Sequence, residues 1–452
     1  MQNIFHGRQQ QYNLMDNFVP PPIEIPNPVP VVVTQKPVPE NNDELGIEDS
    51  ELLDAKENEK EEERNDTEER SDIDEVEEDT APPKPEGILT SIWEYNCDLT
   101  ANFEVNNFTW NKENKNILAA AYGSSSESND VASSRSGMIL CWSVKNPATP
   151  ERILKVEGAG VSSVNFSSVN PSILAAGLDD GTVAIYDIRR KENTPVLETI
   201  KSHTGTVWDL KWVNRGKDVG ERLHSVGVDG RVHSWSIKKG LEASEIMRLK
   251  RIGRANEIGG DAMISRESGG MSIDFSPVDS NFYLVGTEDG GILKCSCSYN
   301  EHPIETYLDH TGPVYSVRWN PYAPDIFISC SADWTVKIWN QESLIPIYTL
   351  ESYSESKDQR SYSVTDVAWS KYSSTMFATS SIVGNLEVWD LSHSTVRPKY
   401  SKTKPGLKLN CTLFAEDVPI VLVGDNKGSI EVLRCEGASN LQQNSLDKIL
   451  QT

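Results

Sequence analysis

Two segments of the chain carry histidine, serine, aspartate and tryptophan at matching spacing, and the first three are the residue types of a hydrolytic triad. They are His203, Ser225, Asp229 and Trp235, and His310, Ser329, Asp333 and Trp339. A catalytic serine stands exposed on a sharp turn, whereas both of these serines fall in the middle of predicted strands. Because the set also occurs twice, we interpret it as a buried hydrogen-bond network in which the aspartate holds the imidazole.

Other patterns that would support catalysis or metal binding are sparse in the sequence. No G-x-x-x-x-G-K-[ST] phosphate loop occurs, and Gly259-Gly260 lacks the lysine that would follow it. Cys295 and Cys297 are separated by one residue, which is too close for a zinc pair, and alternation places both on one strand face. We therefore expect neither an enzyme nor a metal or cofactor site.

The charge of the chain is concentrated in one segment. Of the formal net charge of −25, residues 40–79 contribute −17 through 21 acidic and four basic residues, which leaves −8 for the other 412 residues. A protein that binds nucleic acid needs a basic surface, so that class is disfavoured. The seven cysteines include no C-x-x-C pair, and no signal segment or membrane-length apolar run occurs. These features predict free thiols in a reducing compartment and no membrane association.

Residues 1–86 differ in composition from the rest and are predicted to form a disordered arm. Eight prolines fall between Pro20 and Pro39, and the acidic run follows. Such a segment buries too little apolar surface to offset the entropy of ordering it. A solvated linker is the favoured interpretation, and a docking arm that orders on a partner is the alternative.

The remaining sequence repeats, and the repeat indicates the fold class. Seven predicted strands end in an aromatic residue, at spacings of 44 to 63 residues, and each is followed by an alternating strand that starts at a turn residue, usually glycine. The aromatic residues are Trp110, Phe166, Trp212, Phe275, Trp319, Trp369 and Phe414. A period of about 40–45 residues with several short strands is typical of a propeller blade. We therefore predict an all-β, seven-bladed WD-repeat β-propeller over residues 87–437.

The ends of the predicted propeller must meet to close the ring. The last repeat ends near Cys435 without a fourth strand, whereas residues 88–96 are apolar and precede the first blade without a repeat of their own. We predict that 88–96 supplies the outer strand of the last blade and removes an open sheet edge. Residues 438–452 are predicted as a tail with a short helix at Ser445–Leu450.

Several strings resemble axonemal dynein intermediate chains, over essentially all of residues 87–437. The most specific are SCSADW (329–334) and KCSCSYN (294–300). KCSCSYNE and MISRESGGMSIDF (263–275) are most similar to the intermediate chain of the two-headed inner arm, and the outer-arm intermediate chain is the close alternative. The resemblance implies a non-catalytic subunit, in the cytoplasm and the ciliary or flagellar axoneme. Its implied partners are a dynein heavy chain, a second intermediate chain, light chains and the axonemal microtubule complex.

The resemblance also implies a light-chain site in the arm, with a Thr-Gln-Thr core in an extended, strand-adding segment. Thr34 and Gln35 supply two of those three residues, and Lys36 follows them. The arm is also short for this family. We therefore favour an ordinary linker at this position over a light-chain site.

Two insertions interrupt the regular spacing and are candidates for contact with a partner. Residues 124–136 stand at the position of an Asp turn, and residues 241–268 at the position of a His loop; the network predicts both on one face of the propeller. The second insertion contains the basic residues Arg248, Lys250, Arg251 and Arg254. A tolerated surface insertion is the favoured interpretation, and the alternative hypothesis is that the insertion contacts a heavy-chain tail or an acidic neighbour such as tubulin.

Two other protein classes remain open from the sequence. Tyr186-Asp187-Ile188-Arg189 matches the Trp/Tyr-Asp-x-Arg box of substrate receptors for cullin–RING ubiquitin ligases, although Tyr-Asp after a strand is also common in the repeat itself. The acidic arm is compatible with a generic scaffold or a histone-binding propeller. Copurification with dynein heavy chains, a cullin adaptor or histones would separate these classes.

Overall fold

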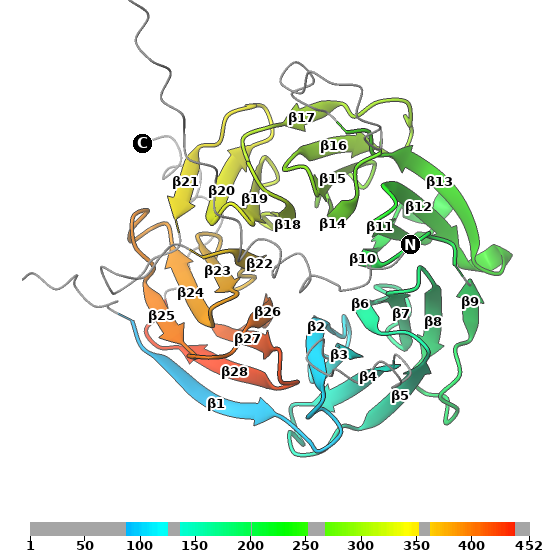
Figure 1. Cartoon of the computed structure of the whole chain (residues 1–452), viewed down its shortest axis with the longest axis horizontal. Helices are drawn as coiled ribbons and strands as arrows, with labels where there is room; N and C mark the ends of the chain where they lie inside the picture. The colour runs from blue at the N-terminus through cyan, green and yellow to red at the C-terminus, as the bar shows by residue number, and fades with distance from the viewer. Residues whose placement is uncertain (1–86, 125–135, 200, 252–266, 352–361, 439–452) are drawn as a thin grey trace, which may run out of the picture. The chain divides into compact units, whose positions relative to one another are not determined.

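The computed structural model describes residues 87–124, 136–199, 201–251, 267–351 and 362–438. Over these ranges the chain forms seven four-stranded antiparallel sheets around a central axis, so the predicted seven-bladed β-propeller is confirmed (Figure 1). The predicted disordered arm and the predicted helix at Ser445–Leu450 lie outside the described residues. Among the described residues, no helix has the length and apolar composition needed to span a bilayer.

Each of the first six blades consists of four strands that are consecutive in the sequence. Blades one to three are β2 (Phe103–Trp110), β3 (Ile117–Ser124), β4 (Ser136–Ser143) and β5 (Arg152–Glu157); β6 (Val161–Phe166), β7 (Ile173–Leu178), β8 (Val183–Asp187) and β9 (Leu197–Thr199); and β10 (Val207–Asn214), β11 (Glu221–Gly227), β12 (Arg231–Ser236) and β13 (Glu242–Arg248). Blades four to six are β14 (Gly270–Phe275), β15 (Phe282–Thr287), β16 (Ile292–Ser296) and β17 (Glu305–Tyr307); β18 (Val314–Trp319), β19 (Ile326–Ser331), β20 (Thr335–Asn340) and β21 (Tyr348–Glu351); and β22 (Val364–Trp369), β23 (Met376–Ser381), β24 (Asn385–Asp390) and β25 (Tyr400–Thr403).

The seventh blade joins the two ends of the propeller. Its inner strands are β26 (Leu409–Phe414), β27 (Ile420–Asp425) and β28 (Ile430–Cys435), and its outer strand is β1 (Leu89–Tyr95). The pairing of β1 with β28 runs from Leu89 opposite Cys435 to Tyr95 opposite Ile430. The structure thus places a strand where the sequence predicted the closing strand, and β28 is not left as an open edge.

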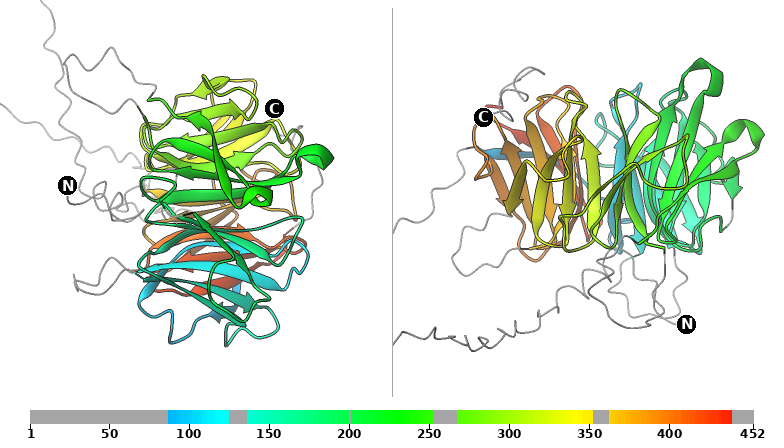
Figure 2. Two further views of the ribbon diagram at one scale, coloured as in Figure 1. Left: turned by 90° about the vertical axis from the view of Figure 1, so that its right-hand side faces the viewer. Right: turned by 90° about the horizontal axis from the view of Figure 1, so that it is seen from above.

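Within each blade the first strand lines the central channel and the last lies on the outside (Figure 1). The strands run between the two faces of the ring (Figure 2). All seven channel strands have a β-bulge near the start, for example between Val207 and Asp209 in β10. A bulge leaves one backbone group outside the sheet pairing, so polar side chains that line the channel can reach it.

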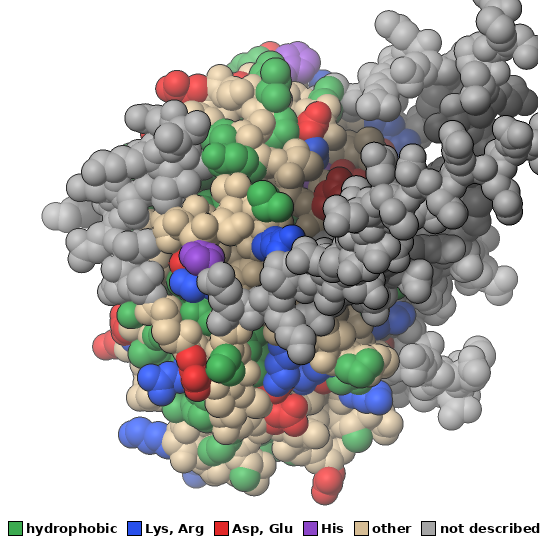
Figure 3. All heavy atoms as spheres, turned by 90° about the vertical axis from the view of Figure 1, so that its left-hand side faces the viewer, with side chains coloured by type: hydrophobic (Ala, Val, Ile, Leu, Met, Phe, Trp, Pro, Cys, Tyr) green, Lys and Arg blue, Asp and Glu red, His purple; other side chains and the backbone are tan. Residues whose placement is uncertain are grey.

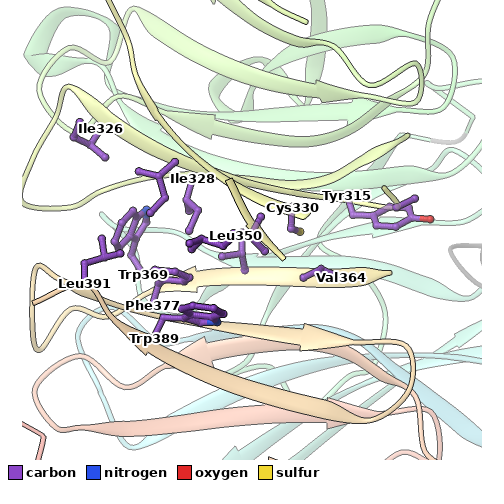
Figure 4. Packing of buried hydrophobic residues seen from close by; sticks show 14 of the residues in the cluster. Tyr315, Ile326, Ile328, Cys330, Leu350, Val364, Trp369, Phe377, Trp389 and Leu391 are labelled. Carbon is purple, nitrogen blue, oxygen red and sulfur yellow. The ribbon is translucent and has the colours of Figure 1, made fainter. Parts of the chain in front are cut away.

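The apolar core lies between neighbouring blades, and the repeated aromatic residues form it. Between blades five and six, Phe377 stacks on Trp389 with ring centroids 6.1 Å apart, and Trp369 packs edge-on against Phe377 at 5.4 Å (Figure 4). Ile328 and Cys330 of blade five are completely buried in the same cluster. The aromatic period in the sequence is therefore the period of sheet-on-sheet packing.

Two sequence expectations differ from the structure. The insertion predicted over 241–268 is not a loop throughout, because Glu242–Arg248 form β13, the outer strand of blade three. Its first four residues are exposed, so the strand lacks the apolar alternation that marks half-buried strands. In blade one the glycine expected at the turn before the alternating strand is Gly137, and it lies inside β4. The glycines expected at this turn in five other blades, Gly181, Gly230, Gly290, Gly384 and Gly428, have positive φ.

Candidate functional site

The second predicted polar set is a closed network inside blade five. His310 Nδ1 lies 2.8 Å from Asp333 Oδ2, and His310 Nε2 lies 2.7 Å from Ser329 Oγ. The indole Nε1–H of Trp339 donates to the same Ser329 oxygen at 2.8 Å. Asp333 also accepts from the backbone N–H of Thr311 and from both N–H and hydroxyl of Thr335. The network ties the loop before β18 to the turn between β19 and β20.

Blade three repeats this geometry with its own four residues. His203 Nδ1 lies 2.9 Å from Asp229 Oδ1, and Nε2 lies 2.7 Å from Ser225 Oγ. Trp235 Nε1–H donates to Ser225 at 2.9 Å. A second imidazole, His233, lies 3.3 Å from His203, and burial, together with the charge of His203, lowers the pKa of His233 to about 4.

These contacts support a structural role for both sets. Each serine oxygen is buried and held by an indole and an imidazole, so it has no access to a substrate. Burial alone would raise the pKa of Asp333, but the hydrogen bond and charge of His310, with the Thr335 and Thr311 donors, lower it to about 2. The carboxylate is therefore stabilised in its charged form and serves as a fixed acceptor.

Substituting Asp333 by alanine is expected to destabilise the propeller. The change leaves the buried His310 ring and two backbone donors without their acceptor, at about 1–3 kcal/mol per unsatisfied group. Denaturant unfolding measures the loss, and Asp325→Ala, at an exposed carboxylate of the same blade, is the matched control. Equal midpoints for Asp333→Ala and the parent, with partner binding lost, would instead assign Asp333 a direct role in function.

The same carboxylate predicts a pH dependence of stability. Because the folded-state pKa of about 2 lies below the ordinary 3.8, Asp333 stabilises the fold fully above about pH 4, and this contribution is lost as the pH falls toward 2. The stability difference between the parent and Asp333→Asn should therefore be constant from pH 7 to 5 and shrink below pH 4. A difference that is unchanged at pH 3 would contradict this assignment.

The central channel holds a second polar group that the sequence analysis missed. Channel strands of all seven blades line a cavity of about 210 Å³. Arg318 Nη1 lies there, 3.0 Å from Asp209 Oδ2. Burial alone would lower the pKa of Arg318, but Asp209, Asp274 and Asp366 outweigh that effect and raise it.

The three channel aspartates also join neighbouring blades. Asp209 accepts from Ile273 N at 3.2 Å, Asp274 from Trp319 N at 2.8 Å, and Asp366 from Thr412 N at 3.0 Å. In each case a carboxylate of one channel strand binds a backbone donor of the next blade's channel strand. The sequence did contain a signal for these polar contacts, namely a charged residue inside a predicted strand, as in WDLKW (208–212) and SVRW (316–319).

One mouth of the channel carries lysines from three blades. Lys211 pairs with Asp274 at 3.2 Å and Lys371 with Glu416 at 2.6 Å. Burial in the concave mouth, and then the charges of Lys371 and Lys211, lower the pKa of Lys112 to about 8. The cations at this mouth are largely balanced by carboxylates, so the mouth is not a strongly basic site.

The predicted basic cluster is largely neutralised within the chain. Arg248 lies on β13 and pairs with Glu245 at 2.5 Å, and Arg251 pairs with Glu288 and Asp289 at 3.1 and 3.0 Å. Lys250 is exposed, and Arg254 lies outside the described residues. The four residues therefore do not form one free basic surface. Acidic and basic side chains are likewise interspersed on the side of the molecule shown in Figure 3.

The remaining singled-out residues are placed as follows. Cys295 is buried in β16 and Cys297 is half-buried just after it, both as free thiols. The described residues contain no cluster of three or more His, Cys, Asp or Glu arranged to hold a metal ion. In the Tyr186–Arg189 box, Arg189 pairs with its own Asp187 at 2.9 Å. Thr34 and Gln35 lie outside the described residues.

Comparisons with known proteins agree with this architecture. The family model described as "WD domain, G-beta repeat" matches residues 149–187 and 301–340. Each match starts just before the outer strand of one blade and ends with the last residue of the third strand of the next, so the sequence repeat is offset from the blade. Because of this offset, the outer strand of the last blade is β1, which comes from the N-terminal end of the propeller. Fold and polar networks together define a WD-repeat β-propeller.

The sequence relatives are more specific. The chain is 43% identical over 355 residues to dynein axonemal intermediate chain 4 of Xenopus laevis, covering 75% of this chain and 46% of the relative. It is 41% identical to the human protein of that name over 393 residues, covering 83% and 44%, respectively. It is 33% identical over 371 residues to the ciliary dynein intermediate chain 2 of Heliocidaris crassispina, covering 80% and 51%. The chain is a relative of the axonemal dynein intermediate chains, and it spans about half their length.

Proposed function

We propose that this chain is a non-catalytic intermediate chain of an axonemal dynein complex in cilia or flagella. The observation that carries the proposal is the 41–43% identity to proteins of that name over 355–393 residues, which cover 75–83% of this chain. The structure is compatible with a scaffold, because the side chains that resemble a hydrolytic triad form buried hydrogen bonds with one another within single blades. In this proposal the propeller binds a heavy chain, which performs the ATP hydrolysis.

The partners follow from the same proposal. They are a dynein heavy chain, a second intermediate chain and the axonemal microtubule complex. Binding of light chains at Thr34-Gln35 stays the less favoured alternative to an ordinary linker. Identity to intermediate chain 4 (37–43%) exceeds identity to intermediate chains 1 and 2 (33–36%). This difference supports the interpretation based on KCSCSYNE, which favours the two-headed inner arm over the outer arm.

Copurification tests the proposal directly. The chain, tagged at its C-terminus, is extracted from axonemes with salt and its partners are identified by mass spectrometry. Recovery of an inner-arm heavy chain in stoichiometric amount is the expected result. Recovery of a cullin adaptor or of histones without a heavy chain would replace the proposal with one of the other two classes.

A charge-reversal experiment tests the loop after β13 as the partner contact. Lys250 is the described cluster member without an ion pair among the described residues, and Arg254 lies outside them, so we expect Lys250→Glu with Arg254→Glu to reduce heavy-chain recovery severalfold. Lys238→Glu, an exposed lysine beyond the other end of blade three, is the matched control. Unchanged recovery with the folded double variant would exclude this loop as the contact.

A further inference from the structure

The contact between the neighbouring blades three and four (Figure 1) contains two arginines that have no ion pair among the described residues. Arg215 follows β10 and Arg222 lies on β11, and both residues are half-buried. Arg215 Nη2 donates to the side-chain oxygen of Asn281 in blade four at 3.1 Å. Elsewhere in the same contact, Lys211 pairs with Asp274 at 3.2 Å. The two arginines therefore carry positive charge that no carboxylate described here neutralises.

Both arginines lie on the side of blade three that packs against blade four. Arg222 and His224 are two residues apart on β11, so their side chains share a face of the sheet. His224 packs against Phe275 of blade four, with ring centroids 4.6 Å apart. The hydrogen bond from Arg215 to Asn281 places the second guanidinium group at the same contact.

The groups around the two arginines include an unpaired donor. His224 is completely buried, and neither of its ring nitrogens has a hydrogen-bond partner within the described part of the chain. Burial, and then the charges of Arg215 and Arg222, lower the pKa of His224 to about 3, so the ring is neutral and keeps one N–H. Burial raises the pKa of Cys297 in blade four, and the charges of the same two arginines oppose that effect. Both guanidinium groups therefore lie near the imidazole and the thiol.

The face of the propeller next to this contact also exposes apolar side chains. Neighbouring strands of a blade are antiparallel, so the turns after the first and third strands lie on one face. In blades three and four these turns expose Val219, Ile237, Val278 and Tyr299, of which Val278 is 77% exposed. The loop after β13 follows a fourth strand and lies on the opposite face. A partner at the two arginines can thus be contacted by apolar as well as charged groups.

We propose that Arg215 and Arg222 bind an oxyanion, a carboxylate or a phosphate group, on a side chain of a partner protein. A guanidinium group can donate two parallel hydrogen bonds to either anion, and the added negative charge offsets the repulsion between the two cations. Apolar residues of the partner beside the anion pack on Val278. The site is separate from the loop after β13 and does not depend on the partner being a dynein heavy chain.

A peptide series on the full-length chain tests the site by fluorescence anisotropy. Peptides of alternating glutamate and leucine are compared with glutamine–leucine peptides, and phosphoserine peptides with serine peptides. We expect about tenfold tighter binding of an anionic peptide than of its neutral counterpart, and the pair with the larger difference identifies the anion. Because the chain carries a net charge of −25, this preference requires a local cationic site.

Substitutions assign the preference to the two arginines. Arg215→Gln with Arg222→Gln should remove it, whereas Arg189→Gln, at an arginine that already pairs with Asp187, should retain it. The double variant should melt at the parent temperature or above it, because two like charges are removed. If it unfolds, Arg222→Gln alone repeats the test, since the Arg222 side chain has no described hydrogen bond or ion pair.

Labelling of cysteines locates the bound peptide. Binding should slow the alkylation of Cys297 by neutral iodoacetamide, measured by mass spectrometry, and leave that of Cys97 unchanged, which is also half-buried but lies between β1 and β2. Equal affinity for anionic and neutral peptides, a preference that persists in the arginine variants, or equal protection of both cysteines overturns the proposal. So does binding of inorganic phosphate without a preference for either anionic peptide.

Discussion

Replacing Arg318 by methionine should lower the free energy of unfolding by about 3 kcal/mol, the lower end of the range for breaking a buried ion pair. The side chain is 20% exposed and its partner Asp209 only 5%, so water replaces the lost guanidinium poorly. The charges of Asp274 and Asp366 also act on Arg318. Without the arginine, three carboxylates would repel one another across a narrow channel.

Denaturant unfolding measures this effect, and a second arginine supplies the control. Arg189 pairs with Asp187 at 2.9 Å, nearly the same distance as in the Arg318 pair, but the side chain of Arg189 is 73% exposed. Arg189→Met should therefore leave stability unchanged. Adding Asp209→Asn to Arg318→Met should recover part of the loss, because the uncompensated charge is removed. Equal effects of Arg189→Met and Arg318→Met would show that the channel is as well solvated as the surface.

The propeller was predictable because its repeated residues have one repeated packing role. Trp369 ends the first strand of blade six, and Trp389 is the last residue but one of its third strand. Both belong to the same core between blades, so the packing repeat is also a sequence repeat. The His310–Asp333 pair was predictable for the same reason. Both partners occur at a constant number of residues from a strand that repeats in the sequence.

The missed features lack such a repeat. β13 was taken for a loop because an outer strand faces solvent and tolerates polar residues such as Glu242 and Glu245. The pairing of Asp209 with Arg318 joins residues that are 109 positions apart, two blades from each other. A single sequence shows both charged residues but not that they form an ion pair, because they come together only when the blades are arranged in the ring. The ion pairs of the basic cluster were missed for the same reason, because Glu288 and Asp289, which pair with Arg251, belong to the next blade.

Removal of β1 should have the largest effect on the molecule, since it opens the ring. A chain of residues 97–452 lacks the strand that covers β28, whereas a chain of residues 87–452 keeps it. Tyr95 is fully buried on β1, with its ring centroid 5.3 Å from that of Trp142. Loss of one such buried aromatic side chain costs about 3–5 kcal/mol. β1 also contributes Glu94, which pairs with Lys404 at 3.4 Å, and Thr90, which donates to Glu436 at 2.5 Å.

We expect residues 87–452 to be a soluble monomer with cooperative unfolding, and residues 97–452 to aggregate through the exposed edge of β28. Limited proteolysis of the full chain should leave a product that starts near Gly87. Size-exclusion chromatography and thermal unfolding compare the two shortened chains. A synthetic peptide of residues 86–97, added during refolding of 97–452, should restore the monomer by pairing with β28. If 97–452 melts like 87–452 without the peptide, closure by β1 does not stabilise the propeller, and the contacts between blades suffice to hold the ring.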